Sequence, residues 1–329
     1  MDLWGPPTTP VRHPWHFHHG ALPESARPSK KDRAGTWGLS DVAFGFFLLL
    51  VLNVALGGVA LSLSLARLVN QPGLDTTNGS ALMDASVKDM TRLLTSGPGV
   101  LAGGLTMWAA FFLAPWLATR RKGAKSLAVD FGFRFRWRRD LLAGAGFAIG
   151  LRVIEWAVTA GLTAAGVNMS TAGNSNMITD LSGPWLVIDA FIVAAIGAPI
   201  FEELFFRGLV FGAFLKNFTR DRDGAAPQSS AGRWATANVG PVWTVWASYR
   251  AFLYRLRVPL AVVLSSVLFG VLHYQGSNTF GSWFVVGTTT SIGMFLAAIR
   301  YRTGRLGMTI CTHVLFNASG VALAVLSQR

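Results

Sequence analysis

The stretch VAFGFFLLLVLNVALGGVALSLSL, residues 42–65, decides the fold, because it contains no charged side chain and is long enough to cross a lipid bilayer. A membrane-spanning helix needs roughly 20 mostly apolar residues. Other stretches of the chain share this mostly apolar character. The sequence therefore predicts an all-α, polytopic membrane helical bundle of about seven transmembrane helices, with room for an eighth. The expected spans are 42–65, 99–119, 141–165, 185–205, 259–274, 282–299 and 306–326, of which 259–274 is the shortest.

The composition also indicates a membrane protein. Hydrophobic residues make up 51% of the chain and charged residues only 14%, and the mean hydropathy is +0.42. A soluble domain averages roughly 25% charged residues. Cys311 is the only cysteine, which excludes a disulfide framework within the chain. Residues 1–40 lack the apolar core of a secretory signal, so we expect the first apolar segment to stay in the membrane as an anchor.

Lysine and arginine are distributed unevenly among the connecting segments. Segment 120–140 holds eight of them and 216–258 holds seven, whereas 166–184 and 275–281 hold none. Positively charged loops stay on the cytoplasmic side of a membrane. The alternation predicts a multi-pass protein of the cell membrane with a cytoplasmic N-terminus. The net charge of +13 is therefore a topology signal, and the expected partner is the lipid bilayer, not nucleic acid.

The same pattern divides the chain into regions. Residues 1–40 predict a disordered cytoplasmic tail, 41–182 the N-terminal membrane helices, and 183–329 the second half of the bundle. The second half contains a cytoplasmic insertion at about 217–258, which begins with a polar linker. Its last part, PVWTVWASYRAFLYRLRV (241–258), predicts an amphipathic helix that lies on the membrane surface.

Ionisable side chains are rare inside the predicted spans. Each costs at least ~2.5–3.5 kcal/mol in hydrocarbon, so each one requires a reason. In PIFEELFFRGLVF (199–211), Glu203 and Arg207 are four residues apart, share a helix face and can form an ion pair. Glu202 is rotated by about 100° from Glu203 and is free to face another partner. Pro199 is expected to loosen or kink the helix just before them. The other ionisable residues in this part of the spans are Arg152, Glu155 and Asp189.

The four-residue spacing recurs in two later spans. Phe269 and His273 are four residues apart, and so are His313 and Asn317. Each pair therefore presents two side chains on one helix face. His273 and His313 are also the only histidines outside the N-terminal tail. An internal ion pair or a helix–helix hydrogen bond would explain any one of these pairs, but three of them in separate spans favour a functional site.

These residues resemble the motifs of the CAAX protease and bacteriocin-processing family, known as CPBP or Abi. EELFFRG (202–208) is similar to its EExxxR motif, FGVLH (269–273) to its FxxxH motif, and HVLFN (313–317) to its HxxxN motif. AIRYRTGRLGMTICTH (298–313) resembles the usual approach to the last motif. The gap between the first two motifs is longer than is common in the family, and the predicted insertion accounts for it.

The resemblance implies that the second half of the chain is the core of an intramembrane endopeptidase, similar to type II CAAX prenyl endopeptidases. Glu202 together with His273 would activate a water molecule, and His313 and Asn317 would donate hydrogen bonds to the oxyanion. The substrate would be a peptide or a membrane protein, cut near the membrane surface. The residues that the resemblance assigns to support of the site are Glu203, Arg207 and Phe269.

The resemblance favours a reaction without a cofactor, and zinc is the alternative. Glu202, His273 and His313 form a ligand set that occurs in catalytic zinc sites, and a second glutamate could act as the base. The sequence contains no HExxH, so three different helices would have to supply these ligands. The chain is rich in alanine, glycine and arginine, which favours a bacterial inner membrane, where cleavage of prenylated proteins is not the obvious task.

Two other classes of protein remain as alternatives. A non-catalytic membrane scaffold or immunity protein could keep the same fold, although the complete set of motif residues argues against a degenerate relative. A transporter is less favoured, because the polar residues cluster in three motifs and no internal repeat is evident.

Overall fold

The computed structural model describes residues 36–70, 78–167, 169, 183–217, 256–274, 276 and 278–326. Within these residues the regular secondary structure is helical, and no strand is present. Six of the described helices are long and apolar enough to cross a membrane. A shorter apolar helix, α12 (Arg257–Val271), occupies the place of the shortest predicted span. The prediction of an all-α, polytopic membrane bundle is therefore confirmed.

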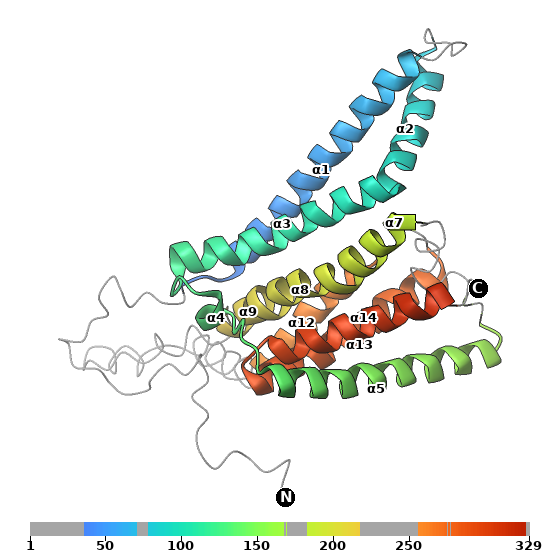
Figure 1. Cartoon of the computed structure of the whole chain (residues 1–329). Coiled ribbons are helices and arrows are strands. Elements are labelled where there is room, and N and C mark those ends of the chain that lie inside the picture. Colours follow the sequence, from blue (N-terminus) through green and yellow to red (C-terminus); the bar gives the residue numbers. More distant parts are fainter. Residues whose placement is uncertain are drawn as a thin grey trace, which may run out of the picture.

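The first three helices form an arm on one side of the molecule. They are α1 (Leu39–Val69), α2 (Gly79–Thr95) and α3 (Gly97–Lys122). Figure 1 shows α1 and α2 side by side, reaching beyond the other helices at one end of the bundle. Helix α3 returns along α1 and reaches the central part of the bundle, where it packs against the helices that carry the first motif.

Helix α2 was not expected, because residues 66–97 were predicted only as a connecting segment. The carboxamide oxygen of Asn78 accepts a hydrogen bond from the backbone N–H of Ala81 at 3.2 Å and so caps the helix. The hydroxyl of Ser64 in α1 donates to the backbone oxygen of Ser86 in α2 at 2.9 Å. The cap and this contact favour a helix in a segment that is too polar to be recognised as a span.

The first motif lies on a continuous helical segment that runs through the bundle and combines two kinds of winding. It consists of α7 (Gly183–Trp185), the π-helix η3 (Leu186–Gly197), α8 (Ala198–Glu202), the π-helix η4 (Glu203–Val210) and α9 (Phe211–Asn217).

In the π-helical parts of this segment, backbone N–H groups bond to carbonyl groups five residues earlier. Examples are Ala198 to Val193 and Phe211 to Phe206. Pro199 stands in the first turn of α8, where the missing N–H of proline is tolerated. The sequence predicted a loosened or kinked helix at Pro199. The structure has a short α-helix there, between two π-helices.

Aromatic side chains hold this segment in the core. Phe205 stacks on Phe111 of α3 with ring centroids 4.5 Å apart, and Phe206 meets Phe269 of α12 edge-on at 5.1 Å. All four rings are almost fully buried. These contacts place the first motif between α3 and α12.

The remaining helices are α5 (Trp137–Ala164), α13 (Phe280–Thr303) and α14 (Gly307–Leu326). Helix α14 packs along α5, and α12 packs along α13 (Figure 1). Gly144 of α5 permits the close approach to α14, because a Cβ atom at this position would lie 2.7 Å from the Cβ of Cys311.

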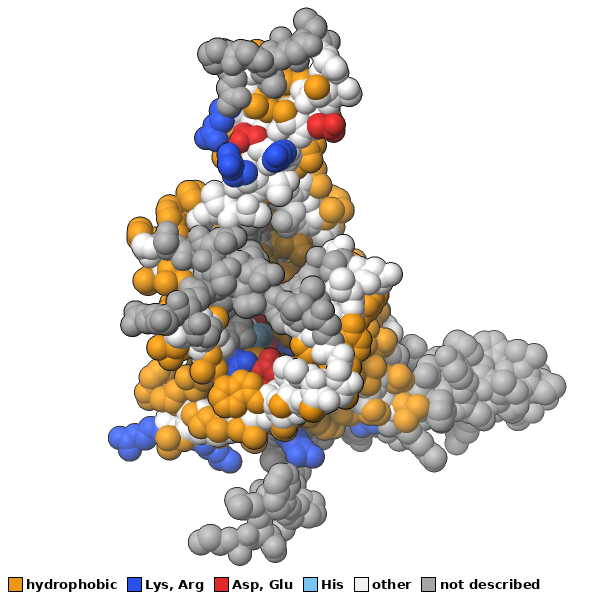
Figure 2. Space-filling model, turned by 90° about the vertical axis from the view of Figure 1, so that its right-hand side faces the viewer, with side chains coloured by type: hydrophobic (Ala, Val, Ile, Leu, Met, Phe, Trp, Pro, Cys, Tyr) orange, Lys and Arg blue, Asp and Glu red, His pale blue; other side chains and the backbone are white. Residues whose placement is uncertain are grey.

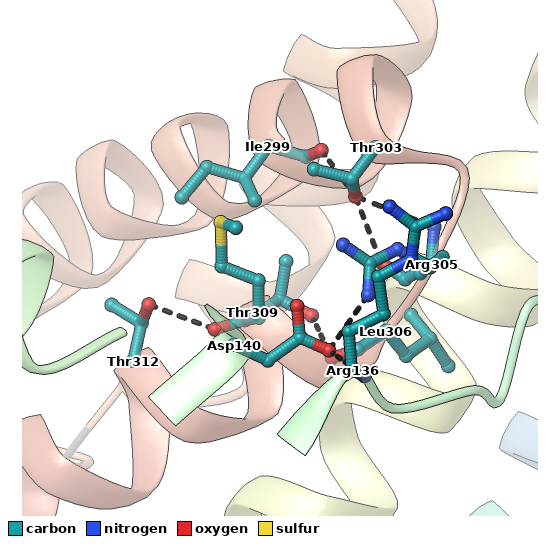
Figure 3. Close-up of polar contacts among 9 residues, drawn as sticks. Arg136, Asp140, Ile299, Thr303, Arg305, Leu306, Thr309 and Thr312 are labelled. Atoms are coloured by element: carbon teal, nitrogen blue, oxygen red, sulfur yellow. Dashed lines mark hydrogen bonds and ion pairs between the residues drawn. The ribbon is translucent and has the colours of Figure 1, made fainter. Parts of the chain in front are cut away.

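A polar clamp ties the start of α5 to the turn between α13 and α14 (Figure 3). The buried carboxylate of Asp140 lies 2.8 Å from the guanidinium of Arg305 and accepts a hydrogen bond from the backbone N–H of Arg136 at 2.6 Å. Gly304 ends α13 with a φ of 66°, in the left-handed region that favours glycine. Because α14 begins at Gly307, the Asp140–Arg305 clamp holds the start of the helix that carries the third motif.

The predicted tail and insertion fall mainly outside the described residues. Residues 1–35 and 218–255 are not described, so the disordered tail, the polar linker and most of the surface helix stay predictions. The end of the predicted tail, however, belongs to the fold. Trp37 is only 2% exposed and packs against Phe131, with ring centroids 4.6 Å apart. The described fold thus begins a few residues before the predicted boundary at residue 40.

Candidate active site

The first motif places an ion pair in the interior of the bundle. Glu203 and Arg207 both lie on η4, and Nη1 of Arg207 is 3.1 Å from Oε1 of Glu203. The two side chains are 0% and 1% exposed. Charges buried so completely are costly unless they are paired. The pairing expected from the four-residue spacing is thus present in the structure.

Glu203 has a second partner, the imidazole of His313 on α14. Nδ1 of His313 lies 3.0 Å from the same oxygen of Glu203. A carboxylate can only accept, so the hydrogen of this bond belongs on Nδ1. The other ring nitrogen, Nε2, is 3.8 Å from Oε2 of Glu202. Arg207, Glu203, His313 and Glu202 therefore form one buried series of contacts, which we name the Arg–Glu–His–Glu chain.

The second motif contacts this chain through Phe269. The centroid of its ring lies 4.1 Å from Cζ of Arg207, as in a cation–π interaction. The same ring lies 5.8 Å from the ring of His313 and 4.7 Å from that of His273. Phe269 thus contacts residues of both the first and the third motif, and its supporting role stays a prediction.

His273 follows the last residue of α12 and is only partly buried. Its Nδ1 donates to the backbone oxygen of Phe269 at 2.8 Å, which leaves Nε2 available to another partner. Among the described residues, no hydrogen bond or ion pair joins His273 to Glu202, the two side chains to which the resemblance assigns water activation.

Asn317 lies one turn beyond His313 on α14. Its side-chain amide donates to the backbone oxygen of Ala194 on η3 at 3.2 Å. An amide carries two hydrogens, so a second hydrogen remains for another acceptor. Asn317 therefore connects α14 to the central helix and still has a donor to offer.

The other ionisable residues of the spans take no part in the Arg–Glu–His–Glu chain, although Arg152 contacts Phe316 within the third-motif stretch HVLFN (313–317). Arg152 forms an ion pair with Glu155 on α5 and donates to the backbone oxygen of Phe316 at 2.5 Å. Asp189 on η3 is 2% exposed, and neither of its carboxylate oxygens has a hydrogen-bond partner among the residues that the structure describes. Figure 2 shows acidic, basic and histidine side chains in a hollow of one face, with hydrophobic side chains around it.

Sequence reasoning did not find several residues that surround the motif side chains. Gly293 of α13 lies beside the guanidinium of Arg207, and Ser266 of α12 lies beside Gly293. The Asp140–Arg305 clamp holds the start of α14. A glycine inside a predicted span is a recognised sign of close helix packing, but it does not reveal which side chain approaches it.

The structure also allows the expected zinc ligands to be located. Glu202 and His313 face each other, and the rings of both His273 and His313 contact the ring of Phe269. In the part of the chain that the structure describes, no group of three histidine, cysteine, aspartate or glutamate side chains is arranged to hold a metal ion. Both the metal-free reaction and the zinc-dependent alternative therefore stay predictions.

Fold and site together define a multi-pass membrane protein with a buried cluster of glutamate, arginine and histidine side chains. Residues 184–319 match the family described as type II CAAX prenyl endopeptidase, Rce1-like. The matched segment contains all three motifs, so the match confirms the resemblance seen in the sequence and supports a CAAX-type intramembrane protease. Comparisons with curated proteins and with solved structures gave no match.

Proposed function

We propose that the protein is an intramembrane endopeptidase that hydrolyses a peptide bond of a membrane-associated or peptide substrate, using a water molecule activated by Glu202. The observation that carries the proposal is the Arg–Glu–His–Glu chain, in which Glu203 fixes His313 and leaves Nε2 of His313 facing Glu202. The match of residues 184–319 to a prenyl endopeptidase family supports the same reaction class.

In the proposed reaction Glu202 takes a proton from water, and the resulting hydroxide attacks the carbonyl carbon of the scissile peptide bond. The carbonyl oxygen becomes an oxyanion in the tetrahedral intermediate. Glu202 then passes the proton to the leaving nitrogen as the carbon–nitrogen bond breaks. His273 would assist in activating the water through Nε2, because its other ring nitrogen, Nδ1, is bonded to the backbone oxygen of Phe269.

The oxyanion requires hydrogen-bond donors that are already in place. His313 supplies one through Nε2 in its protonated form, while Nδ1 stays bonded to Glu203. Asn317 supplies the second through the amide hydrogen that Ala194 does not use. In this scheme Glu203 and Arg207 orient His313 and do not touch the substrate.

The match of residues 184–319 to a prenyl endopeptidase family supports prenylated carboxyl-terminal peptides as one substrate class. The protein would cut such a substrate, or another peptide anchored in the bilayer, close to the cytoplasmic surface. A cytoplasmic N-terminus and a bacterial inner membrane remain part of this proposal, because the positively charged connecting segments support that orientation.

Peptide cleavage by the purified protein in liposomes tests the proposal. Glu202→Gln keeps the size of the side chain and should lower kcat at least 10²-fold, the lower range for loss of a general base. Glu155→Gln is the matched control, because Glu155 is also an intramembrane glutamate that pairs with an arginine. It should retain most of the activity.

The same experiment separates the proposal from its alternatives. Equal behaviour of the wild type and Glu202→Gln against a broad peptide library would favour the non-catalytic scaffold or immunity protein. Activity that is lost on chelation and regained with zinc would favour the zinc-dependent form of the protease.

A further inference from the structure

The guanidinium of Arg207 is enclosed on one side by a glycine of α13. A Cβ atom at Gly293 would lie 3.2 Å from Nη2 of Arg207, 3.1 Å from the Cβ of Ser266 and 3.3 Å from Cδ1 of Phe269. All three separations are shorter than an ordinary van der Waals contact of 3.4–4 Å. Gly293 itself is buried. An alanine at this position would therefore require Arg207, Ser266 or Phe269 to shift by a few tenths of an ångström.

The neighbours of Gly293 have little freedom to move away. Arg207 is held by Glu203 at 3.1 Å and by the ring of Phe269 at 4.1 Å. Phe269 in turn packs against Phe206 in the core. A methyl group at Gly293 would thus displace a guanidinium that is fixed on its other sides.

We propose that Gly293 is a positioning residue of the site, because its missing side chain gives Arg207 the room to hold Glu203, which orients His313. The kinetic test of this inference rests on the proposed peptidase function. The packing of Gly293 against Arg207 does not depend on that function. Gly293 lies on α13, which carries no residue of the three motifs. A helix outside the motifs would thus also help to shape the site.

Helix α13 supplies a matched control for the test. Gly287 lies on the same helix and is exposed, and apart from the backbone of its own helix no atom of the described residues lies within 4 Å of a Cβ built on it. Glycine to alanine raises helix propensity by roughly 0.8–1.0 kcal/mol at either position, so backbone effects cancel in the comparison. The difference between Gly293→Ala and Gly287→Ala isolates the contact with Arg207 and its neighbours.

We expect Gly293→Ala to lower kcat roughly three- to tenfold with an unchanged KM, since misplacement by about 1 Å can cost a hundredfold and the shift here is a fraction of that. Gly287→Ala should leave both constants unchanged. Thermal melting of both variants in detergent shows whether each is folded.

A size exchange provides the rescue variant. Ser266→Gly removes the Cβ atom that lies closest to the added methyl group, so the double variant Ser266→Gly, Gly293→Ala should recover kcat relative to Gly293→Ala. If Gly293→Ala does not fold, the double variant is compared with Ser266→Gly alone. A folded double variant with the kcat of Ser266→Gly and the wild-type His313 signal described next then supports the inference, and one with a much lower kcat but a wild-type His313 signal overturns it.

A spectroscopic measurement keeps this inference separate from the proposed function. Side-chain ¹⁵N resonances of the histidines, with His313→Asn used for assignment, report the bond between Nδ1 of His313 and Glu203. The expected result is a shifted His313 signal in Gly293→Ala and a wild-type signal in Gly287→Ala. Identical His313 signals and identical kcat in the two folded variants overturn the inference. A shifted His313 signal in a protein without peptidase activity overturns only the proposed function.

Discussion

Nδ1 of His313 and Oε1 of Glu203 are 3.0 Å apart, and the same carboxylate oxygen is 3.1 Å from Nη1 of Arg207. Oε1 of Glu203 thus accepts a hydrogen bond from His313 of the third motif and forms an ion pair with Arg207 of the first motif. The bond fixes the orientation of the imidazole, so that its Nε2 faces Glu202. The two glutamates are adjacent in the sequence but occupy different positions in the Arg–Glu–His–Glu chain. Glu203 lies between Arg207 and His313, and Glu202 is the last member of the chain.

Replacement of Glu203 by Gln should impair both stability and activity. Loss of one partner of a buried pair costs about 3–5 kcal/mol, because the other charge stays buried without compensation. We expect a clearly lower melting temperature in detergent and a strongly reduced kcat. A variant that melts like the wild type would contradict the assignment of Glu203 as the buried partner of Arg207.

The double variant Glu203→Gln, Arg207→Met separates stability from catalysis. Replacement of both members of a buried ion pair by uncharged groups is often neutral or stabilising. The double variant should therefore melt closer to the wild type than Glu203→Gln does. Peptidase activity should stay low, because His313 has lost its charged partner. Recovery of activity along with stability would show that the pair serves folding alone.

The Asp140–Arg305 clamp should contribute to stability and, through α14, to activity. We expect Arg305→Gln to lower the melting temperature and to reduce kcat by a few fold, because the start of α14 loses its attachment to α5. A double-mutant cycle with Asp140→Asn should give a coupling of roughly 0.5–3 kcal/mol. Arg138→Gln is the control for loss of charge, since Arg138 is exposed on the same helix as Asp140. Equal effects of Arg305→Gln and Arg138→Gln would rule out a specific clamp.

Chelation tests the cofactor prediction directly. The metal-free reaction predicts that the activity of the purified protein survives prolonged dialysis against a strong zinc chelator. Glu203 is already shared by Arg207 and His313, and Nδ1 of His273 is bonded to Phe269. Hydrolysis that disappears on dialysis and returns with stoichiometric zinc would establish the alternative, with Glu202, His273 and His313 as the first ligands to examine by mutation.

The predicted orientation can be measured with single cysteines in a Cys311→Ala background. The connection between α3 and α4 (Leu127–Asp130) and the start of α2 lie at opposite ends of the bundle (Figure 1). Ala124 in the connection and Ser80 in the first turn of α2 are exposed. A membrane-impermeant maleimide should label Ala124→Cys from the cytoplasmic side and Ser80→Cys from the other side. The reverse labelling would overturn the predicted cytoplasmic N-terminus.

The sequence predicts local relationships in this protein better than distant ones. Four-residue spacing correctly predicts that Glu203 and Arg207 pair, because both lie within one helical segment. It cannot predict that Glu203 bonds to His313, which is 110 residues away, since that contact depends on how two helices pack.

The unexpected features have physical reasons of the same kind. Helix α2 escapes a search for apolar spans because its sequence mixes polar and apolar residues. The π-helical winding around Pro199 leaves no clear mark in the sequence, because apolar residues occupy both kinds of helix. Gly293 is visible as a glycine in a span, but only the packed structure shows that Arg207 needs its space.

The Arg–Glu–His–Glu chain has one more consequence, which concerns its overall charge. With His313 protonated, two anions and two cations cancel, so the cluster is electrically neutral as a unit in a medium where a lone charge is expensive. In the proposed reaction the proton moves from water to Glu202 and on to the departing amine, and no charge enters or leaves the interior. Electroneutrality throughout the cycle would allow a polar reaction to proceed in surroundings that otherwise exclude ions.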